Sequence, residues 1–156
     1  MNGAHPAVTA DVPGGLDWLH AVIDGRVEPA PVARLVGMRF VSAERGVTVW
    51  ELDAAAEHAN PMGTIHGGIL CDLADAAMGT AWVSTLAEGE TFTTLELKIN
   101  FTRPFWTGPL RAEGRVLNGG RTIGLLACDV TDADGRLIAH ATSTCMTLRG
   151  DAAAGR

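Results

Sequence analysis

The segment over residues 67–87, GGILCDLADAAMGTAWVSTLA, constrains the fold more than any other part of the chain, because it is apolar on two opposite sides. At about 100° per residue, one helical stripe collects Ile69, Leu70, Leu73, Ala77, Thr80 and Ala81, and the nearly opposite stripe collects Cys71, Asp75, Met78 and Trp82. A helix that is hydrophobic all round is normally buried all round. We therefore predict a long central helix, with Asp75 held among a thiol, a thioether and an indole.

Small residues are frequent in this predicted helix, and they allow other backbone segments to come close: Ala74, Ala76, Ala77, Gly79 and Ala81. Such a helix suits a curved sheet that wraps around it. One sheet face cannot bury both apolar stripes, so the second stripe needs a separate cover. The simplest cover is another copy of the chain, and we therefore predict a homo-oligomer.

The chain after this helix has the pattern of an antiparallel sheet. In residues 91–101, TFTTLELKINF, alternation places Thr93, Leu95, Leu97, Ile99 and Phe101 on a core face and Thr94, Glu96, Lys98 and Asn100 on the other face. Further strands are predicted over residues 110–117, 122–130 and 137–148, joined by the tight-turn sequences NGG and DADG. A hairpin is predicted over residues 35–52 and a short helix over residues 16–23.

No alternation of strands with helices signals a parallel sheet, so the predicted fold class is α+β, with an antiparallel sheet covering one long helix. A chain of 156 residues fits one domain of ordinary size. We predict an N-terminal extension with the short helix over residues 1–33, the main domain over residues 34–149 and a flexible tail over residues 150–156. The aperiodic sequences at both ends predict loosely held termini.

Charge and cysteine spacing exclude several function classes. The net charge of −6 and the single lysine, Lys98, remove the basic surface that nucleic-acid binding needs. Cys71, Cys128 and Cys145 lack zinc-site spacing, so no metal is predicted. No basic segment precedes an apolar leader, and acids interrupt the longest apolar run. We expect a soluble cytoplasmic protein without membrane association, whose partners are small molecules or copies of itself.

Two glycines, Gly67 and Gly68, open the predicted helix directly after His66. The first N–H groups of a helix have no internal partner and carry the positive end of its dipole, so a carbonyl oxygen could approach them closely here. This arrangement is a candidate oxyanion hole. His66 and Asp75 are nine residues apart, roughly 13 Å of helix rise. We therefore predict that the acid and the oxyanion donor come from different subunits at one interface.

The joint pattern of these residues resembles the hotdog-fold acyl-CoA thioesterases of the phenylacetic-acid-degradation (PaaI-like) type. The resemblance runs from about Arg34 to Leu148 and rests on NPMGTIHGG, an Asp nine residues past the His, TLELKINFTRP, and the NGGRT and DADGRLIAHA hairpins. It implies a hotdog fold, in which a curved antiparallel sheet wraps a long central helix. It also implies homodimers with two interfacial sites, often paired into homotetramers, and hydrolysis of an acyl thioester.

The resemblance also assigns roles, position by position. Asp75 would be the nucleophile or the general base for water, and the N–H of Gly67 would polarise the thioester carbonyl. Asn60 and His66 would orient the thioester sulfur and the water, and Thr94 aligns with a hydroxyl residue that holds the attacking water. Coenzyme A enters as part of the substrate, so no separate cofactor is implied. Gly68 belongs to the same glycine pair as Gly67, and Arg121 with Thr122 could bind the phosphates of coenzyme A.

Each assignment has a structural alternative. Asp75 could be a solvated acid of the helix surface, His66 a polar cap, Asn60 a turn former and Thr94 an ordinary strand residue. Asp72, three residues before Asp75, is expected to be solvated and is left out of the site. No GxSxG motif supports a serine hydrolase.

Two other functions fit the same fold. One is a catalytically silent module that binds acyl-CoA or lipid, and the other is an acyl dehydratase or hydratase. The spacing of Asp75 after the HGG sequence favours hydrolysis. Aryl and medium-chain acyl groups both remain possible substrates.

Overall fold

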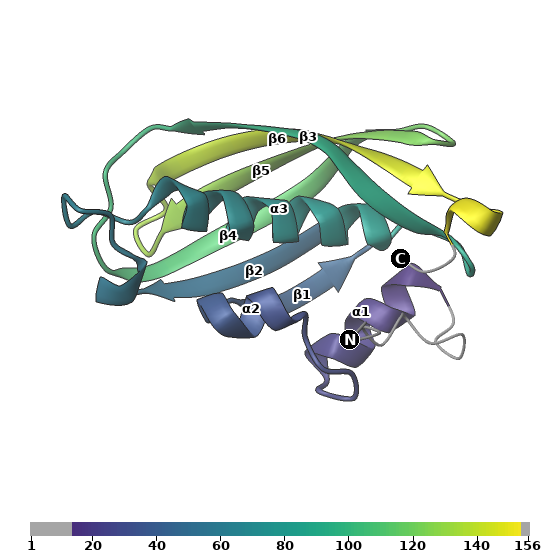
Figure 1. The fold of residues 1–156 in the computed structure, drawn as a ribbon, viewed down its shortest axis with the longest axis horizontal. Coiled ribbons are helices and arrows are strands. Elements are labelled where there is room, and N and C mark those ends of the chain that lie inside the picture. The colour runs from purple at the N-terminus through teal and green to yellow at the C-terminus, as the bar shows by residue number, and fades with distance from the viewer. Residues whose placement is uncertain (1–13, 154–156) are drawn as a thin grey trace, which may run out of the picture.

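The long apolar segment forms helix α3 (Gly67–Val83), which lies along the inner face of a sheet in a computed structural model that describes residues 14–153 (Figure 1). The sheet is antiparallel and six-stranded, with the order β1-β2-β4-β5-β6-β3. Its strands are β1 (Arg39–Glu44), β2 (Val47–Ala54), β3 (Thr91–Phe101), β4 (Gly108–Gly119), β5 (Ile123–Asp132) and β6 (Leu137–Leu148). The architecture confirms the predicted α+β class and its wrapped central helix.

The N-terminal part of the described chain carries two helices, α1 (Gly15–Ile23) and α2 (Pro31–Val36), and short 3-10 turns occur at η1 (Ala56–His58) and η2 (Gly150–Ala152). Helix α2 corrects the prediction of a strand from Leu35. Pro31 stands at the start of α2, where its missing N–H costs nothing. Gly37, with φ of +81°, ends the helix, and the first strand begins only at Arg39.

The large apolar side chains of the second stripe, Met78 and Trp82, are buried within one chain, which corrects the reasoning that this stripe needs another copy. Met78 is 0% exposed and Trp82 is 3% exposed. The sheet curls far enough to reach Trp82, because a Cβ atom at Gly124 would lie 2.4 Å from its ring. The open strip of the helix instead contains Asp72, Asp75, Ala76 and Thr80, the acids exposed and the other two partly exposed. This strip is therefore the part of α3 that the sheet of the same chain leaves open.

The backbones of α3 and β4 meet at Gly114. A Cβ atom there would lie 2.3 Å from both the carbonyl carbon and the carbonyl oxygen of Ala77. Thr48 on the neighbouring strand β2 donates a hydrogen bond to the same Ala77 oxygen at 2.7 Å. Glycine at position 114 is thus a condition for the close packing of the helix on the sheet.

We expect Gly114→Ala to lower the free energy of unfolding by about 3 kcal/mol, at the upper end of the overpacking range, because backbone atoms cannot rotate away. For a chain of this size, that loss should lower the Tm by about 6–12 °C in a thermal melt. Gly119→Ala is the matched control, since its Cβ would meet its nearest atom at 3.4 Å. Equal melting temperatures for the two variants would refute this account of the helix–sheet contact.

The ends of several elements differ from the predictions. Helix α3 ends at Val83, so residues 84–87 leave the predicted helix. Residues 150–152 of the predicted flexible tail form the 3-10 turn η2. The predictions for residues 1–13 and 154–156 lie outside the described residues.

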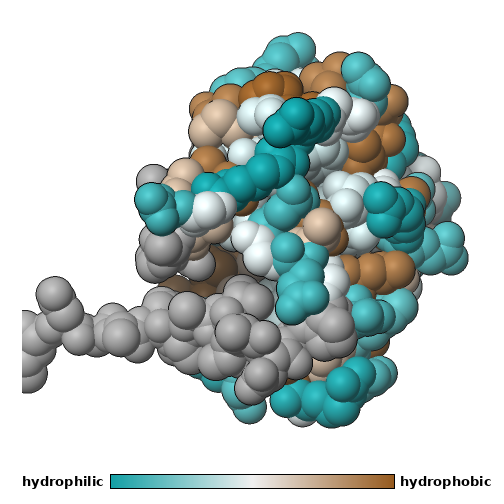
Figure 2. Space-filling model, turned by 90° about the vertical axis from the view of Figure 1, so that its right-hand side faces the viewer, coloured by the Kyte–Doolittle hydropathy of each residue, from teal (hydrophilic) through white to brown (hydrophobic). Residues whose placement is uncertain are grey.

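Hydrophilic residues predominate at the end of the molecule that carries η2 and the start of β3, with small hydrophobic patches between them (Figure 2). Between residues 14 and 153, no helix is both long and apolar enough to cross a membrane.

Candidate active site

His66 caps the start of α3. Its Nδ1 atom accepts a hydrogen bond from the N–H of Gly68 at 2.9 Å, and its φ and ψ of −67° and 133° are extended, as an N-cap residue requires. Within one chain, His66 therefore acts as the polar N-cap of α3. The N–H of Gly67 precedes it in the first turn and has no acceptor among residues 14–153. That N–H is therefore a free hydrogen-bond donor within the described part of the chain, and it lies at the positive end of the helix dipole.

Packing supplies a reason for both glycines besides the approach of a carbonyl oxygen. A Cβ atom at Gly67 would lie 2.9 Å from Cζ of Phe101, whose ring therefore covers this turn of the helix. A Cβ atom at Gly68 would lie 2.9 Å from Nδ1 of His66. The N–H of Gly68 is thus engaged by the cap, whereas the N–H of Gly67 has no acceptor within the described residues, and Gly67 is partly exposed beside Phe101.

Asn60 holds the loop that leads into α3. Its Oδ1 atom accepts from the N–H of Met62 at 2.9 Å, and its Nδ2 atom donates to Oγ1 of Thr64 at 2.9 Å. Asn60 therefore stabilises this turn, in agreement with the turn-former alternative, and its role in the site stays a prediction. Asn60 also lines a pocket together with Gly67, Leu70, Phe101 and Phe105. The structure thus brings Asn60, His66 and Gly67 together at one end of the helix.

Asp75 lies eight residues farther along α3, on its open strip. Its Oδ1 atom accepts a hydrogen bond from Oγ1 of Thr94 at 3.1 Å. The residue is exposed in the single chain, which corrects the prediction that Cys71, Met78 and Trp82 enclose it. It instead borders a groove lined by Trp50, Thr80 and Phe92 among other residues.

A β-bulge brings Thr94 to Asp75. The pairing of β3 with β6 slips between Thr94 and Glu96, so Leu95 has no partner and is 51% exposed. The predicted alternation is therefore wrong for Thr93 and Leu95 and correct for Leu97 and Ile99, which pack against the core. The extra residue moves Phe92 and Thr94 to the face toward α3, because a bulge reverses which side chains point inward. Phe101 covers Gly67 as described, although it is 53% exposed.

The surroundings of Asp75 change the acidity of its carboxyl group. Burial by the surrounding protein atoms raises the pKa of Asp75 above its ordinary value, the hydrogen bond from Thr94 lowers it, and the negative charge of Asp72 raises it. The net direction is upward, even though part of the side chain still reaches solvent. A carboxylate with a raised pKa is a better proton acceptor than an ordinary surface aspartate.

The predicted site residues therefore form two groups within one chain. Asp75 and Thr94 form one group, and Asn60, His66 and Gly67 form the other. The helix axis rises about 12 Å between Gly67 and Asp75, too far for one carbonyl group to contact both. Asp72 is exposed beside the first group, as expected.

Arg121 and Thr122 belong to neither group. They lie in the turn between β4 and β5, next to glycines that pack on Trp82 near the C-terminal end of α3. The carbonyl oxygen of Thr122 accepts from the N–H of Thr147 at 2.8 Å, and both residues of the turn are exposed. A phosphate-binding role for them stays a prediction.

Sequence patterns did not identify Trp50 and Phe92 as site residues. The Nε1 atom of Trp50 donates to Oγ1 of Thr80 at 2.9 Å, which orients the indole along the groove beside Asp75. Phe92 lies two residues before Thr94, and residues two apart in a strand share one face of the sheet. This spacing could have placed Phe92 beside Thr94 from the sequence. No group of three or more His, Cys, Asp or Glu side chains within the described part of the chain is arranged to hold a metal ion.

Residues 62–139 match the family described as the thioesterase superfamily. Over 129 residues the chain is 30% identical to human acyl-coenzyme A thioesterase 13, covering 81% of this chain and 91% of that protein. A solved structure of a phenylacetic acid degradation-related protein from Ralstonia eutropha is 30% identical, with a TM-score of 0.75 over 83% of this chain and 98% of that one. The Escherichia coli PaaI protein, at 23% identity, shares the fold, with a TM-score of 0.76 over 85% of this chain and 94% of its own.

Proposed function

The chain belongs to the thioesterase superfamily and is a thioester hydrolase with a PaaI-like hotdog fold, and from this premise we propose that it hydrolyses an acyl-CoA thioester to the free acid and coenzyme A. The human relative is named as an acyl-coenzyme A thioesterase, which supports the coenzyme A part of this substrate. Water is the co-reactant, and coenzyme A enters only as part of the substrate. The proposed acyl group is aryl or medium-chain.

Asp75 carries the proposal. Its carboxylate has a raised pKa, accepts a hydrogen bond from Thr94 and borders an apolar groove. It either takes a proton from water as the water attacks the thioester carbonyl carbon, or it attacks that carbon itself. In both routes the carbonyl oxygen becomes negatively charged, the carbon–sulfur bond breaks, and the thiolate of coenzyme A leaves and gains a proton. In the second route the acyl group is then joined to Asp75 as a mixed anhydride, and water hydrolyses this anhydride to the free acid and restores the carboxylate. In the first route, the hydroxyl of Thr94 helps to hold the water.

The oxyanion donor in this proposal is the N–H of Gly67 in a second copy of the chain. Within a single chain, this N–H and Asp75 are about 12 Å apart along the helix. The open strip of α3 that carries Asp75 is exposed or partly exposed, so a partner could contact it. Asn60 and His66 adjoin the donor and would orient the sulfur and the water. The proposed assembly is a homodimer with two such sites, alone or paired as a homotetramer. A monomer by light scattering would contradict it.

Release of free thiol from acyl-CoA substrates, followed with a colour-forming thiol reagent, tests the proposed reaction directly. We expect thiol release that depends on the concentration of the enzyme and equals the acid formed. If acyl-CoA raised the Tm while no thiol appeared, the chain would be a silent binding module. If the acyl chain were hydrated or dehydrated with the thioester intact, the proposal would fail in favour of a dehydratase or hydratase.

The acidity of Asp75 predicts the pH dependence of the reaction. The ionised carboxylate is the active form, so kcat/KM should rise with pH through the pKa of Asp75, which lies above the ordinary value of about 3.9. Thr94→Val should move this rise to still higher pH, because it removes the hydrogen bond that lowers the pKa. A pH–rate profile of kcat/KM for both proteins checks the shift. An identical acidic limb in the variant would contradict this role of Thr94.

A further inference from the structure

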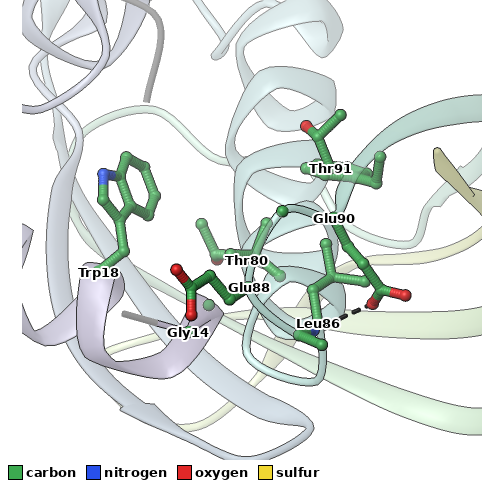
Figure 3. Close-up of a pocket in the computed structure, with 12 residues that line it drawn as sticks. Gly14, Trp18, Thr80, Leu86, Glu88, Glu90 and Thr91 are labelled. Carbon is green, nitrogen blue, oxygen red and sulfur yellow. Dashed lines mark hydrogen bonds between the residues drawn. The ribbon is translucent and has the colours of Figure 1, made fainter. Parts of the chain in front are cut away.

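A second apolar pocket lies where α1 meets the C-terminal end of α3. The N–H of Gly15 donates to the carbonyl oxygen of Leu86 at 3.3 Å, and a Cβ atom at Gly15 would lie 1.9 Å from the carbonyl oxygen of Val83. Helix α1 can therefore approach the C-terminal end of α3 this closely only because residue 15 is glycine. Trp18 projects from α1 on one side of the pocket and Thr80 stands on α3 on another side, with the turn over residues 88–91 nearby (Figure 3).

This pocket and the groove beside Asp75 share two lining residues, Thr80 and Phe92. Phe92 is partly exposed, and its ring lies against α3, because a Cβ atom at Gly79 would meet the ring at 3.0 Å. The two hollows are therefore consecutive along α3, with Phe92 and Thr80 between them. To go from the first hollow to the second, a flexible chain that starts at Asp75 has to pass Phe92 and Thr80.

The length of this path discriminates between substrates. The helix rises about 12 Å over the eight residues from Asp75 to Val83. An extended chain advances about 3.5 Å for every three bonds, so the path holds about ten bonds. A single aromatic ring on a short linker would stop in the first hollow, near Phe92.

Two acidic residues, Glu88 and Glu90, are among the residues that line the second pocket. Glu90 is held in place, since its Oε2 atom accepts from the N–H of Ala87 at 3.0 Å and its Oε1 atom accepts from Nε of Arg149 at 2.6 Å. Glu88 is exposed nearby (Figure 3). The remaining wall is built largely from Trp18, Val83, Leu86 and Phe92. An apolar chain end suits this wall, whereas a carboxylate there would be desolvated and would lie near the negative charge of Glu88.

We propose that the two hollows form one acyl-binding channel, that the substrate is a linear medium-chain acyl thioester, and that Trp18 of α1 is the residue that limits the chain length. This inference rests on the proposed hydrolysis at Asp75. The carbonyl carbon lies at Asp75, the chain crosses Phe92, and its apolar end reaches Trp18.

A chain-length series of saturated acyl-CoA substrates tests the proposal through kcat/KM from thiol release. For the unsubstituted protein we expect kcat/KM to rise about three- to fourfold per added methylene, to reach a maximum near the length that fills the channel, and then to fall. A chain of the optimal length that ends in a carboxylate should be turned over far more slowly than its methyl-ended counterpart.

Two variants should move the maximum in opposite directions. Trp18→Ala removes the end wall and should move the maximum to longer chains. Val83→Phe fills the channel and should move the maximum to shorter chains. Trp106→Ala removes a tryptophan outside the channel that is 56% exposed, and it should leave the profile unchanged. Trp18→Leu replaces Trp18→Ala if the latter fails to fold.

The outcomes separate this inference from the proposed function. Thiol release with a profile that Trp18→Ala does not move, or a preference for an aryl-CoA over every linear chain, would overturn the channel while hydrolysis stood. Absence of thiol release from every substrate would instead overturn the proposed hydrolysis, and the channel with it.

Discussion

Replacing Asp75 with asparagine is expected to lower kcat/KM for acyl-CoA hydrolysis by about 10²–10⁴-fold, the range that a positioned general base contributes. Asparagine keeps the shape of the side chain and can still accept the hydrogen bond from Thr94, but it cannot take a proton and is a poor nucleophile. The loss should appear in kcat, because the substituted group acts in the transition state. Steady-state thiol release by the two purified proteins measures it.

Asp72→Asn is the matched control for this prediction, because it changes a neighbouring acid that is also exposed on α3. It should retain most of the activity. Loss of folding is not expected to explain the effect at Asp75. The pKa of this carboxyl group is higher in the folded state than in the unfolded state. Its contribution to stability therefore becomes less favourable as pH rises from the unfolded pKa to the folded pKa. The Tm of Asp75→Asn at neutral pH should therefore equal or exceed that of the unsubstituted protein. Wild-type turnover by this variant would remove Asp75 from the reaction.

Gly67→Pro is expected to lower kcat by about 10²–10³-fold, the effect of losing one oxyanion donor. Proline removes the N–H of residue 67 and is tolerated at the first position of a helix. The preceding residue, His66, already has the extended φ and ψ of −67° and 133° that a residue before proline requires. The substitution therefore deletes the donor while the helix start keeps its backbone conformation.

Gly67→Ala separates the donor from the packing change. Alanine keeps the N–H but adds the same Cβ atom as proline, 2.9 Å from the ring of Phe101. This ring belongs to a half-exposed side chain and can move, so alanine should cost much less activity than proline. Equal losses in the two variants would show that contact with Phe101, and not the missing N–H, causes the effect.

The periodic part of the fold could be predicted from the sequence. The strands over residues 91–101 and 137–148 have the predicted bounds, because tight turns and long alternating patterns mark both. The alternation failed at Leu95, since one unpaired residue in a bulge reverses the two faces. Pairing with β6 decides that bulge, and no local pattern within β3 reveals it.

The cover of the helix could not be predicted, because sheet curvature depends on contacts between distant residues. Gly114 and Gly124 let the sheet approach α3 closely enough to bury Met78 and Trp82 in the same chain. A helical wheel shows which stripes are apolar, but it contains no information on how far a sheet curls. The two apolar stripes therefore do not require a second copy of the chain. The proposal of a second copy is instead based on the open strip of α3.

The structure places the candidate site residues in two groups, and their roles in the reaction stay predictions. Asp75 and Thr94 are hydrogen-bonded, and Asn60, His66 and Gly67 are grouped at the start of α3. The groove beside Asp75 depends on Trp50 and Phe92, which come from different strands. Their positions follow from strand order and register, which a single sequence does not specify.

In the proposed dimer, one active site takes Asp75 from one copy and the N–H of Gly67 from another. Mixing the inactive Asp75→Asn and Gly67→Pro variants, by co-expression or by unfolding and refolding them together, tests it most directly. A mixed dimer has one site with both substitutions and one site with neither, so random mixing should restore about a quarter of the unsubstituted activity. Activity no greater than the average of the two separate variants would contradict a shared site.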